Sequence, residues 1–304
     1  MARPLFDDDH EAYRESFRSF IAREADGDIR TVFAKAAEHG FASMAVPEDR
    51  GGAGIEDRRF GAVVAEELGL AGHAGLGLIV ATHNEVCVPA LGEHAQAGRL
   101  AAFAIGSTDR VPGGMVADDL VVADGDRVFT FAIEDRTPSE EGFGLTGVGF
   151  ADIEVPDDVT ELDAPTWAVD QQLAIAVLAL AGARHALSLT LGYVADRKAF
   201  GVPIASFQNT RYALAAVSAE IEAAQAFLDD CVLRDRTPAR AAAAKLTATE
   251  IQGRAVDAGL QFHGGYGYML EYPISSAYAD ARFLRLHGGT SEALKDVLAG
   301  ALGM

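Results

Sequence analysis

The residues best suited to chemistry begin at Arg197, in the segment Arg-Lys-Ala-Phe-Gly-Val-Pro-Ile-Ala-Ser-Phe-Gln that ends at Gln208. An arginine carries a permanent charge on a planar fork of donors, which matches the oxygens of a pyrophosphate. Phe200 can pack on an adenosine or ribose, and Gln208 can hydrogen-bond cofactor oxygens. The segment therefore favours anion binding, although Arg197 could instead pair with Asp196 or Asp280 while Phe200 packs in the core.

A second segment, Gln-Phe-His-Gly-Gly-Tyr-Gly over 261–267, supports the same chemistry. Gly264 and Gly265 let the backbone approach a ligand closely and present unhindered N–H groups to an anion. Gly264 could equally end a helix, and both roles are compatible. A third segment, His-Gly-Gly-Thr-Ser-Glu over 287–292, has no acid or base at its glycines.

Long helices must position these segments. Apolar periodicity predicts helices over 168–196, 207–233, 238–263 and 274–302, with Pro238 at a helix start. Four long helices with short connections are typical of an antiparallel bundle.

The first hundred residues also predict helices, over 7–38, 56–72 and 75–100, with a glycine-rich loop over 46–54. The character changes near residue 101, where runs at 120–123, 127–133 and 147–155 are rich in β-branched and aromatic residues. Asp124-Gly125-Asp126 predicts a hairpin turn between the first two runs. Residues 157–163 form an acidic linker in this interpretation.

Composition excludes several classes of protein. The net charge of −20 opposes binding to nucleic acid and to anionic membranes. Cys87 and Cys231 are too few for a disulfide framework and favour a reducing compartment. The run from Leu173 to Leu191 is interrupted by Arg184 and His185, which favours a buried core helix over a membrane span. We expect no metal site. We also expect a cytoplasmic protein, since the start of the chain has no secretory pattern.

The order of helices, small β region and helical bundle resembles the acyl-CoA dehydrogenase family over nearly the whole chain. The segments at 197–208 and 261–268 carry this resemblance most specifically, and 45–54 with Glu66-Glu67-Leu68-Gly69 is similar to a family pattern near the N-terminus. The resemblance implies a mainly α fold with three parts. These are an N-terminal helical domain (1–100), a reduced middle β domain (101–163) and a C-terminal four-helix bundle (164–304).

The resemblance also implies FAD as cofactor. It assigns cofactor-binding roles, as a clamp for the ADP half of FAD, to six residues: Arg197, Phe200, Gln208, Gln261, Gly264 and Gly265. In the family this clamp contacts the flavin bound mainly by a neighbouring subunit.

The catalytic base is missing. The family carries a carboxylate at one of two positions, which correspond here to Gly288 and Gln171, and neither residue can take the α proton of an acyl-CoA. The middle region also holds about half of the strands expected for covering the flavin ring. We therefore assign no catalytic residue to this chain.

A short, base-less member resembles the small subunits of heteromeric (α2β2) dehydrogenases that act on sterol- and steroid-derived acyl-CoA in actinobacteria. This resemblance implies a full-length acyl-CoA dehydrogenase partner that supplies the catalytic glutamate and binds most of the substrate. An electron-transfer flavoprotein or similar acceptor would take the electrons. The chain alone would be inactive.

Three alternatives stay open from the sequence. The chain could be a self-sufficient homotetramer with a base relocated to Glu271 or Glu292, although each of these reads more simply as a solvated charge. It could be a non-catalytic flavin-binding, electron-transfer or scaffold protein. It could also be a nitroalkane-oxidising or flavin-monooxygenase relative on the same fold, which would again need an acid near the flavin.

Overall fold

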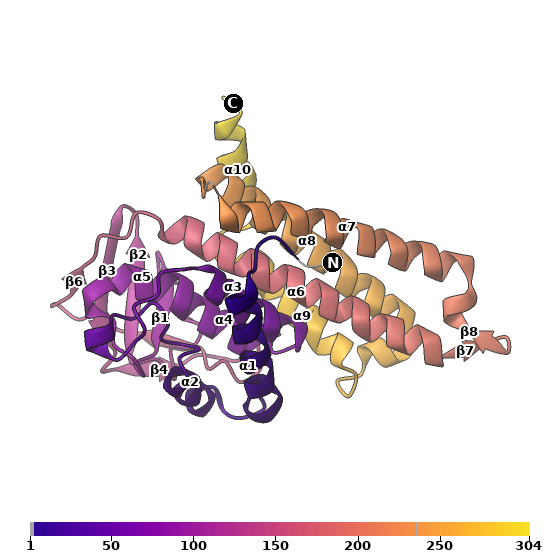
Figure 1. Ribbon diagram of the computed structural model, residues 1–304, viewed down its shortest axis with the longest axis horizontal. Coiled ribbons are helices and arrows are strands. Elements are labelled where there is room, and N and C mark those ends of the chain that lie inside the picture. Colours follow the sequence, from indigo (N-terminus) through magenta and orange to yellow (C-terminus); the bar gives the residue numbers. More distant parts are fainter. Residues whose placement is uncertain (1–2, 235) are drawn as a thin grey trace.

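The computed structural model describes residues 3–234 and 236–304. A small β region lies at one end of the molecule and a long helical bundle extends to the other, with the N-terminal helices packed beside them (Figure 1). The predicted fold class is confirmed: the chain is mainly α, with helices at both ends of the sequence and a small sheet region between them.

Short helices make up the N-terminal region. They are α1 (Asp8–Glu24), α2 (Ile29–Glu38), η1 (Glu48–Arg50), α3 (Arg59–Leu70), α4 (Ala74–Thr82), the π-helical turn η2 (His83–Cys87), α5 (Val88–Leu91) and η3 (Gly92–His94). Asp7 caps α1, because its side chain accepts hydrogen bonds from the backbone N–H groups of Asp9 and His10. The helix predicted over 75–100 is confirmed in its first part, since helical turns run from Ala74 to His94, but it contains the π-turn and ends before residue 100. Gly92, with φ +52°, ends its last α-helical turn.

The middle region contains a four-stranded sheet in the order β1-β2-β3-β6 and a separate pair β4-β5. The strands are β1 (Ala101–Ile105), β2 (Asp119–Asp124), β3 (Arg127–Ala132), β4 (Arg136–Pro138), β5 (Ala151–Ile153) and β6 (Thr160–Glu161). The predicted hairpin is confirmed, because β2 and β3 pair antiparallel around Gly125, whose φ is +60°. Two expectations need correction: the run 147–155 forms only the short β5, and the acidic linker contains β6, which pairs with β3.

The C-terminal helices are α6 (Trp167–Asp196), α7 (Gln208–Leu233), α8 (Pro238–His263), α9 (Pro273–Leu286) and α10 (Ser291–Ala301). Pro238 starts α8 as predicted. The fourth helix predicted over 274–302 is wrong: it is two helices separated by residues 287–290. Gly288 and Gly289 adopt φ +69° and +110°, which a helix cannot contain. The C-terminal α10 projects from the body of the molecule (Figure 1).

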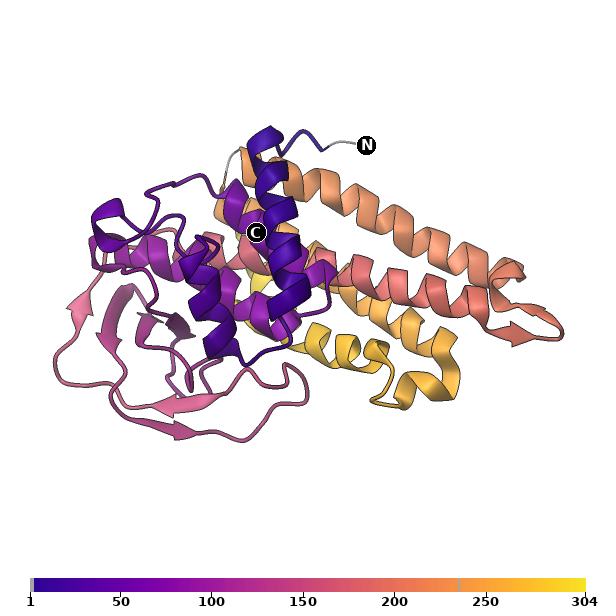
Figure 2. The same cartoon turned by 60° about the horizontal axis from the view of Figure 1, so that its bottom comes forward.

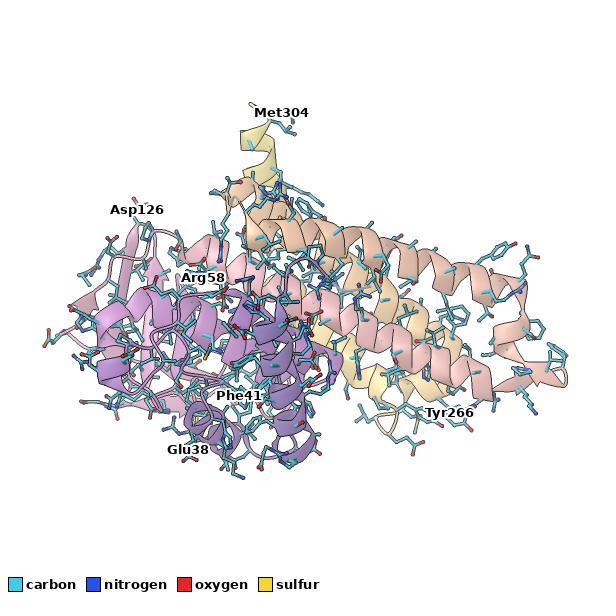
Figure 3. The ribbon with its side chains drawn as sticks, viewed as in Figure 1. Glu38, Phe41, Arg58, Asp126, Tyr266 and Met304 are labelled. Carbon is cyan, nitrogen blue, oxygen red and sulfur yellow. The ribbon has the colours of Figure 1, made fainter. Side chains whose placement is uncertain are left out.

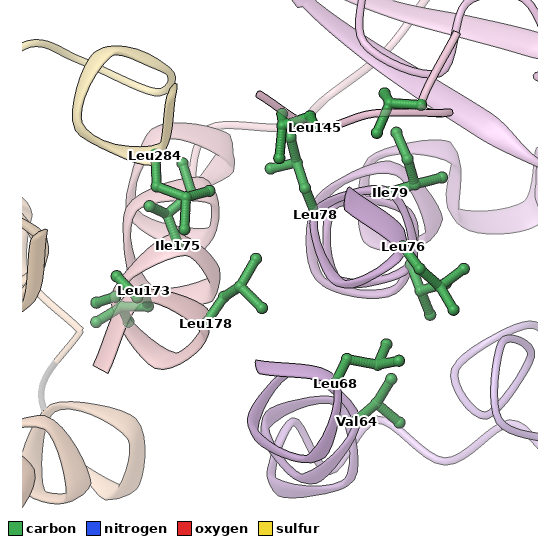
Figure 4. Packing of buried hydrophobic residues seen from close by; sticks show 14 of the residues in the cluster. Val64, Leu68, Leu76, Leu78, Ile79, Leu145, Leu173, Ile175, Leu178 and Leu284 are labelled. Carbon is green, nitrogen blue, oxygen red and sulfur yellow. The ribbon is translucent and has the colours of Figure 1, made fainter. Parts of the chain in front are cut away.

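The core lies where α3, α4, α6 and α9 meet, and Figure 4 shows leucine and isoleucine side chains from these helices packed together. Leu68, Leu178 and Leu284 are among its fully buried members, and each such side chain stabilises the fold by about 1.5–3 kcal/mol. Two helical stretches, Ala74–His94 and Trp167–Asp196, are long and apolar enough to cross a membrane, but most of each lies inside this core. The second one agrees with the buried helix predicted for 173–191.

Candidate functional site

The end of the bundle farthest from the sheet carries the first candidate segment (Figure 1). Arg197 ends α6, and the chain then forms the hairpin of β7 (Lys198–Ala199) and β8 (Val202–Pro203) before η4 (Ile204–Ser206) leads into α7. Phe200 stands at the tip of this hairpin with φ +53° and a side chain that is 98% exposed. A positive φ is strained for a residue with a Cβ, so the hairpin holds an apolar ring in water at a conformational cost.

The second segment lies at the same end. Gly264 ends α8 with φ +59°, which confirms its role as a helix cap, and η5 (Gly264–Tyr268) follows. A Cβ added at Gly264 or Gly265 would meet nothing within 4 Å. The backbone of this turn is therefore open to a ligand and is not packed against the protein.

A hollow of about 480 Å³ joins the two segments, and Arg197, Gly264 and Gly265 all line it. The guanidinium carbon of Arg197 lies 5.8 Å from the centre of the Tyr266 ring, a residue that Figure 3 labels at this end of the bundle. We call this hollow the clamp. The structure thus brings together Arg197 and Gly264, which are 67 residues apart in the sequence.

The other three predicted clamp residues lie near the hollow but outside its lining. Gln208 is the first residue of α7, Gln261 lies in the last turn of α8, and both are exposed. The ring of Phe200 stands edge-on to that of Phe207, with ring centres 6.4 Å apart. These side chains form an exposed rim that is free to contact another molecule.

The purely structural roles considered for this segment are wrong. Among the described residues no carboxylate lies within ion-pair distance of Arg197. Asp280 instead accepts a hydrogen bond from the backbone N–H of Leu145 at 2.6 Å. Phe200 is exposed and does not belong to the core. The cation at the clamp is therefore available to a ligand.

The two positions that would carry a base lie side by side at the other end of α6. A Cβ added at Gly288 would be 2.7 Å from Ile175 Cδ1 and 3.1 Å from Gln171 Cγ. It would also be 3.7 Å from Lys245 Cε. A side chain at residue 288 would therefore require the end of the Ile175 side chain to move.

Lys245 was not identified from the sequence, although it fills this site. Its side chain is completely buried, and Nζ donates a hydrogen bond to the Gly289 carbonyl at 2.6 Å. Burial lowers the pKa of Lys245 to about 8. Burial, and then the charge of Lys245, lowers the pKa of His287 to about 4. A cation therefore occupies the region where the family places an anion. We call Gln171, Ile175, Lys245 and Gly288 the base-position cluster.

Gln171 is the least satisfied member of this cluster. It is fully buried, and neither its amide nitrogen nor its amide oxygen has a hydrogen-bond partner among the described residues. An unpaired buried amide is destabilising, by about 1–3 kcal/mol for each group. A side-chain amide neither takes up nor releases a proton near neutral pH, so Gln171 cannot act as the base.

A buried ion network stands next to Gln171. Asp170 pairs with Arg58 at 2.9 Å and with Arg236 at 2.6 Å, and it accepts a hydrogen bond from the Thr166 hydroxyl at 2.9 Å. The network ties the start of α3 and the turn before α8 to the first turn of α6. It fixes the start of α6, which carries Gln171 and Ile175.

The remaining candidate acids are not placed to serve this cluster. Glu271 is exposed and lines the clamp at the opposite end of the bundle, and Glu292 is exposed in the first turn of α10. The Glu66-Glu67 pair has a structural role, since Arg14 pairs with both residues. No group of three or more histidine, cysteine or acidic residues within the described ranges could hold a metal ion.

Comparison with known proteins places these features. Residues 7–101 match the model of the acyl-CoA dehydrogenase N-terminal domain, and residues 170–303 match that of the acyl-CoA dehydrogenase C-terminal domain. Together the two matches cover well over half of the chain. The chain belongs to the acyl-CoA dehydrogenase family.

Individual relatives refine this assignment. The long-chain specific acyl-CoA dehydrogenase of Rattus norvegicus is 39% identical over 133 residues, which are 42% of this chain and 31% of that protein. The match thus spans about a third of that relative's length. The 3-(aryl)acrylate reductase of Clostridium sporogenes is 26% identical, and the alignment covers 98% of this chain and 99% of the length of the reductase. That alignment runs over 377 positions against 304 residues here, so more than 70 positions have no counterpart in this chain.

A solved structure gives the same fold together with a cofactor. An acyl-CoA dehydrogenase complexed with FAD from Bacillus anthracis superposes with a TM-score of 0.85. It is 20% identical, and the match covers 98% of this chain and 66% of that one. The prediction that the chain belongs to a family of FAD-binding flavoproteins is confirmed.

The residues present fit one half of FAD. Arg197, which has no carboxylate partner among the described residues, and the Gly264-Gly265 turn, whose backbone a ligand can approach closely, line one hollow, which suits a pyrophosphate. The base-position cluster contains no carboxylate, and a side chain at residue 288 would be crowded by Ile175 and Gln171.

Proposed function

We propose that this chain is the non-catalytic subunit of a heteromeric FAD-dependent acyl-CoA dehydrogenase. A full-length partner supplies the catalytic glutamate and the pocket for the flavin ring and the acyl-CoA. The assembly is an α2β2 tetramer with one FAD per heterodimer. It removes hydrogen across the α,β bond of a CoA thioester, and an electron-transfer flavoprotein or similar acceptor takes the electrons.

The observation that carries this proposal is the filled base-position cluster. A Cβ at Gly288 would collide with Ile175, and the buried ammonium of Lys245 stands beside it. A site that must abstract a proton needs a base within about 3 Å of the reacting carbon and room for the substrate. Neither condition is met at this position, while the clamp at the opposite end of the bundle is open.

The clamp residues would act by binding and orientation. Arg197 would bind the pyrophosphate of a flavin held mainly by the partner, and the N–H groups after Gly264 would bind further phosphate oxygens. Phe200 would pack on the adenosine, which would remove its exposed ring from water. Bound FAD supplies the hydride acceptor for the reaction, and this chain keeps it in place.

The finer assignment of the substrate rests on the resemblance alone. It points to a steroid or sterol side-chain or ring-derived acyl-CoA. A cytoplasmic location is a separate part of the proposal, which the low cysteine count supports. Purified complex can be assayed with a steroid-derived acyl-CoA and with straight-chain acyl-CoA of matched length. A preference for the straight chain would remove the steroid assignment and leave the subunit role intact.

Separate and joint expression tests the subunit role. The chain expressed alone should be free of flavin and inactive, and the chain expressed with its full-length partner should purify as a yellow tetramer with two FAD. Flavin absorbance against protein mass measures both. A homotetramer of this chain alone that carries stoichiometric FAD and oxidises an acyl-CoA would refute the proposal and favour a relocated base.

A further inference from the structure

A pocket of about 470 Å³ lies in the N-terminal region and shares no lining residue with the clamp. It forms where the π-turn η2 and α5 face α1, the start of α3 and the loop that follows α2. Its lining includes Tyr13, Ile55, Phe60, Asn84, Glu85 and Glu93. Its volume falls in the range of small-molecule sites. Arg58, which Figure 3 labels, also lines it.

Glu85 is the buried acid of this pocket. Only 9% of the residue is exposed, and the ion-pair partner of its carboxylate among the described residues is Arg58 at 3.8 Å, beyond hydrogen-bond distance. Gly61 makes room for it, since a Cβ there would stand 1.6 Å from Glu85 Oε1. The residue belongs to a π-turn, a rare helical distortion that is frequent at functional sites. A buried carboxylate without a hydrogen bond is unfavourable unless a ligand or ion satisfies it.

Tyr13 gives the pocket a second unsatisfied oxygen. Its hydroxyl is buried and has no hydrogen-bond partner in the described part of the chain. Its ring stands at a steep angle to those of Phe41 and Phe60, with centres 5.3 and 5.0 Å away. Tyr13 and Phe60 both line the pocket, so a ligand there meets aromatic surface beside the acid.

Most charges of the lining are carboxylates, which accept hydrogen bonds. Arg58 is the one cation in the lining, and it is engaged by Asp170 at 2.9 Å and lies 3.8 Å from Glu85. Asp57 is engaged by Arg59 at 2.6 Å. Glu56 and Glu93 add two exposed carboxylates to the lining.

We propose that this pocket binds an organic cation, a primary amine attached to an apolar or aromatic body. The ammonium would donate hydrogen bonds to Glu85 and Tyr13, and the rings of Tyr13 and Phe60 would contact the body of the ligand and contribute cation–π attraction. An anion is excluded by the acidic lining and by the net charge of −20. The inference does not depend on the proposed dehydrogenase role.

Calorimetric titration of the full chain tests it with three matched probes: 4-phenylbutylamine, 4-phenylbutanol and 4-phenylbutyrate. The amine should bind, and the alcohol and the acid should bind at least tenfold more weakly. Glu85→Gln keeps the shape and removes the charge, so it should weaken amine binding about ten- to a hundredfold. Tyr13→Phe should weaken it by a smaller factor.

Controls separate this result from general charge effects. Glu154→Gln removes one exposed carboxylate outside the pocket and should leave the affinity for the amine unchanged. Equal affinity for the amine and the alcohol would overturn the proposal, as would an amine affinity unaffected by Glu85→Gln. If Glu85→Gln does not fold, Gly61→Ala provides a second test, because its Cβ must displace the Glu85 carboxylate and should also weaken amine binding.

Discussion

Gly288→Ala should destabilise the fold by more than the backbone conformation alone explains. A residue with a Cβ at φ +69° is strained by about 1–2 kcal/mol. The new Cβ would also stand 2.7 Å from Ile175 Cδ1 and 3.1 Å from Gln171 Cγ, and overpacking of a core adds about 1–3 kcal/mol. The expected loss in the free energy of unfolding is therefore about 2–5 kcal/mol.

Urea unfolding followed by circular dichroism measures this loss, and Gly147→Ala is the matched control. Gly147 has φ +79°, but a Cβ there would meet nothing within 4 Å. It should therefore show only the backbone strain of about 1–2 kcal/mol. The difference between the losses of unfolding free energy in the two variants measures the cost of crowding at the base-position cluster.

Gly288→Glu extends the same reasoning to function. It restores the residue type of the family but places a longer side chain in the same filled space. In the heteromeric complex we expect one FAD per heterodimer and unchanged specific activity. Equal stabilities for Gly288→Ala and Gly147→Ala, or a doubled flavin content in Gly288→Glu, would refute the claim that this site is closed.

Four further predictions follow from particular contacts. Arg197→Ala should weaken FAD binding by the complex about ten- to a hundredfold, as measured by flavin release, while Lys198→Ala should not; equal effects would assign the binding to bulk charge. Asp170→Asn removes the shared partner of Arg58 and Arg236 and should lower the free energy of unfolding by about 3–5 kcal/mol, measured in urea; a loss under 1 kcal/mol would contradict a buried network. Burial lowers the folded-state pKa of Lys245 to about 8, so the unfolded chain binds more protons above that pH, and stability should rise between pH 8 and 10.5 in the wild type relative to Lys245→Met; identical pH profiles would contradict this. Burial raises the pKa of Glu85 to about 7, despite the opposing charges of Arg58 and Arg236 and with Asp170 and Asp57 adding to the shift. The contribution of protonated Glu85 to the stability of the fold is thus present below about pH 4.5 and lost as the pH rises through 7. Glu85→Gln should therefore become more stable relative to the wild type between pH 4.5 and 7. A stability difference that stays constant over this range would contradict the raised pKa.

The clamp could be predicted from the sequence because its chemistry is local. Arg197, Phe200 and the Gly264-Gly265 turn each lie in a short segment whose residue types restrict its role. The meeting of the two segments follows from the helix order, because α7 runs back antiparallel between α6 and α8, and the C-terminal ends of α6 and α8 therefore lie at the same end of the bundle. The break in the last helix was also readable, because two consecutive glycines at 288–289 disfavour a continuous helix.

The filling of the base position could not be predicted in the same way. Lys245 is 43 residues from Gly288 in the sequence, and the packing of α8 against α6 and α10 brings them together. A lysine in a helix is usually exposed, so only the run of alanines at 241–244 hinted at a buried face. The pocket at Glu85 depends on a π-turn, whose hydrogen-bond pattern leaves no periodic signal in five residues.

The position of FAD in a structure of the co-purified complex tests the central claim most directly. The account predicts that the flavin pyrophosphate contacts Arg197 of this chain and that the flavin ring lies against the partner subunit, with the base-position cluster closed. A flavin ring bound beside Gly288 and Gln171 of this chain, or a pyrophosphate that leaves Arg197 free, would contradict it.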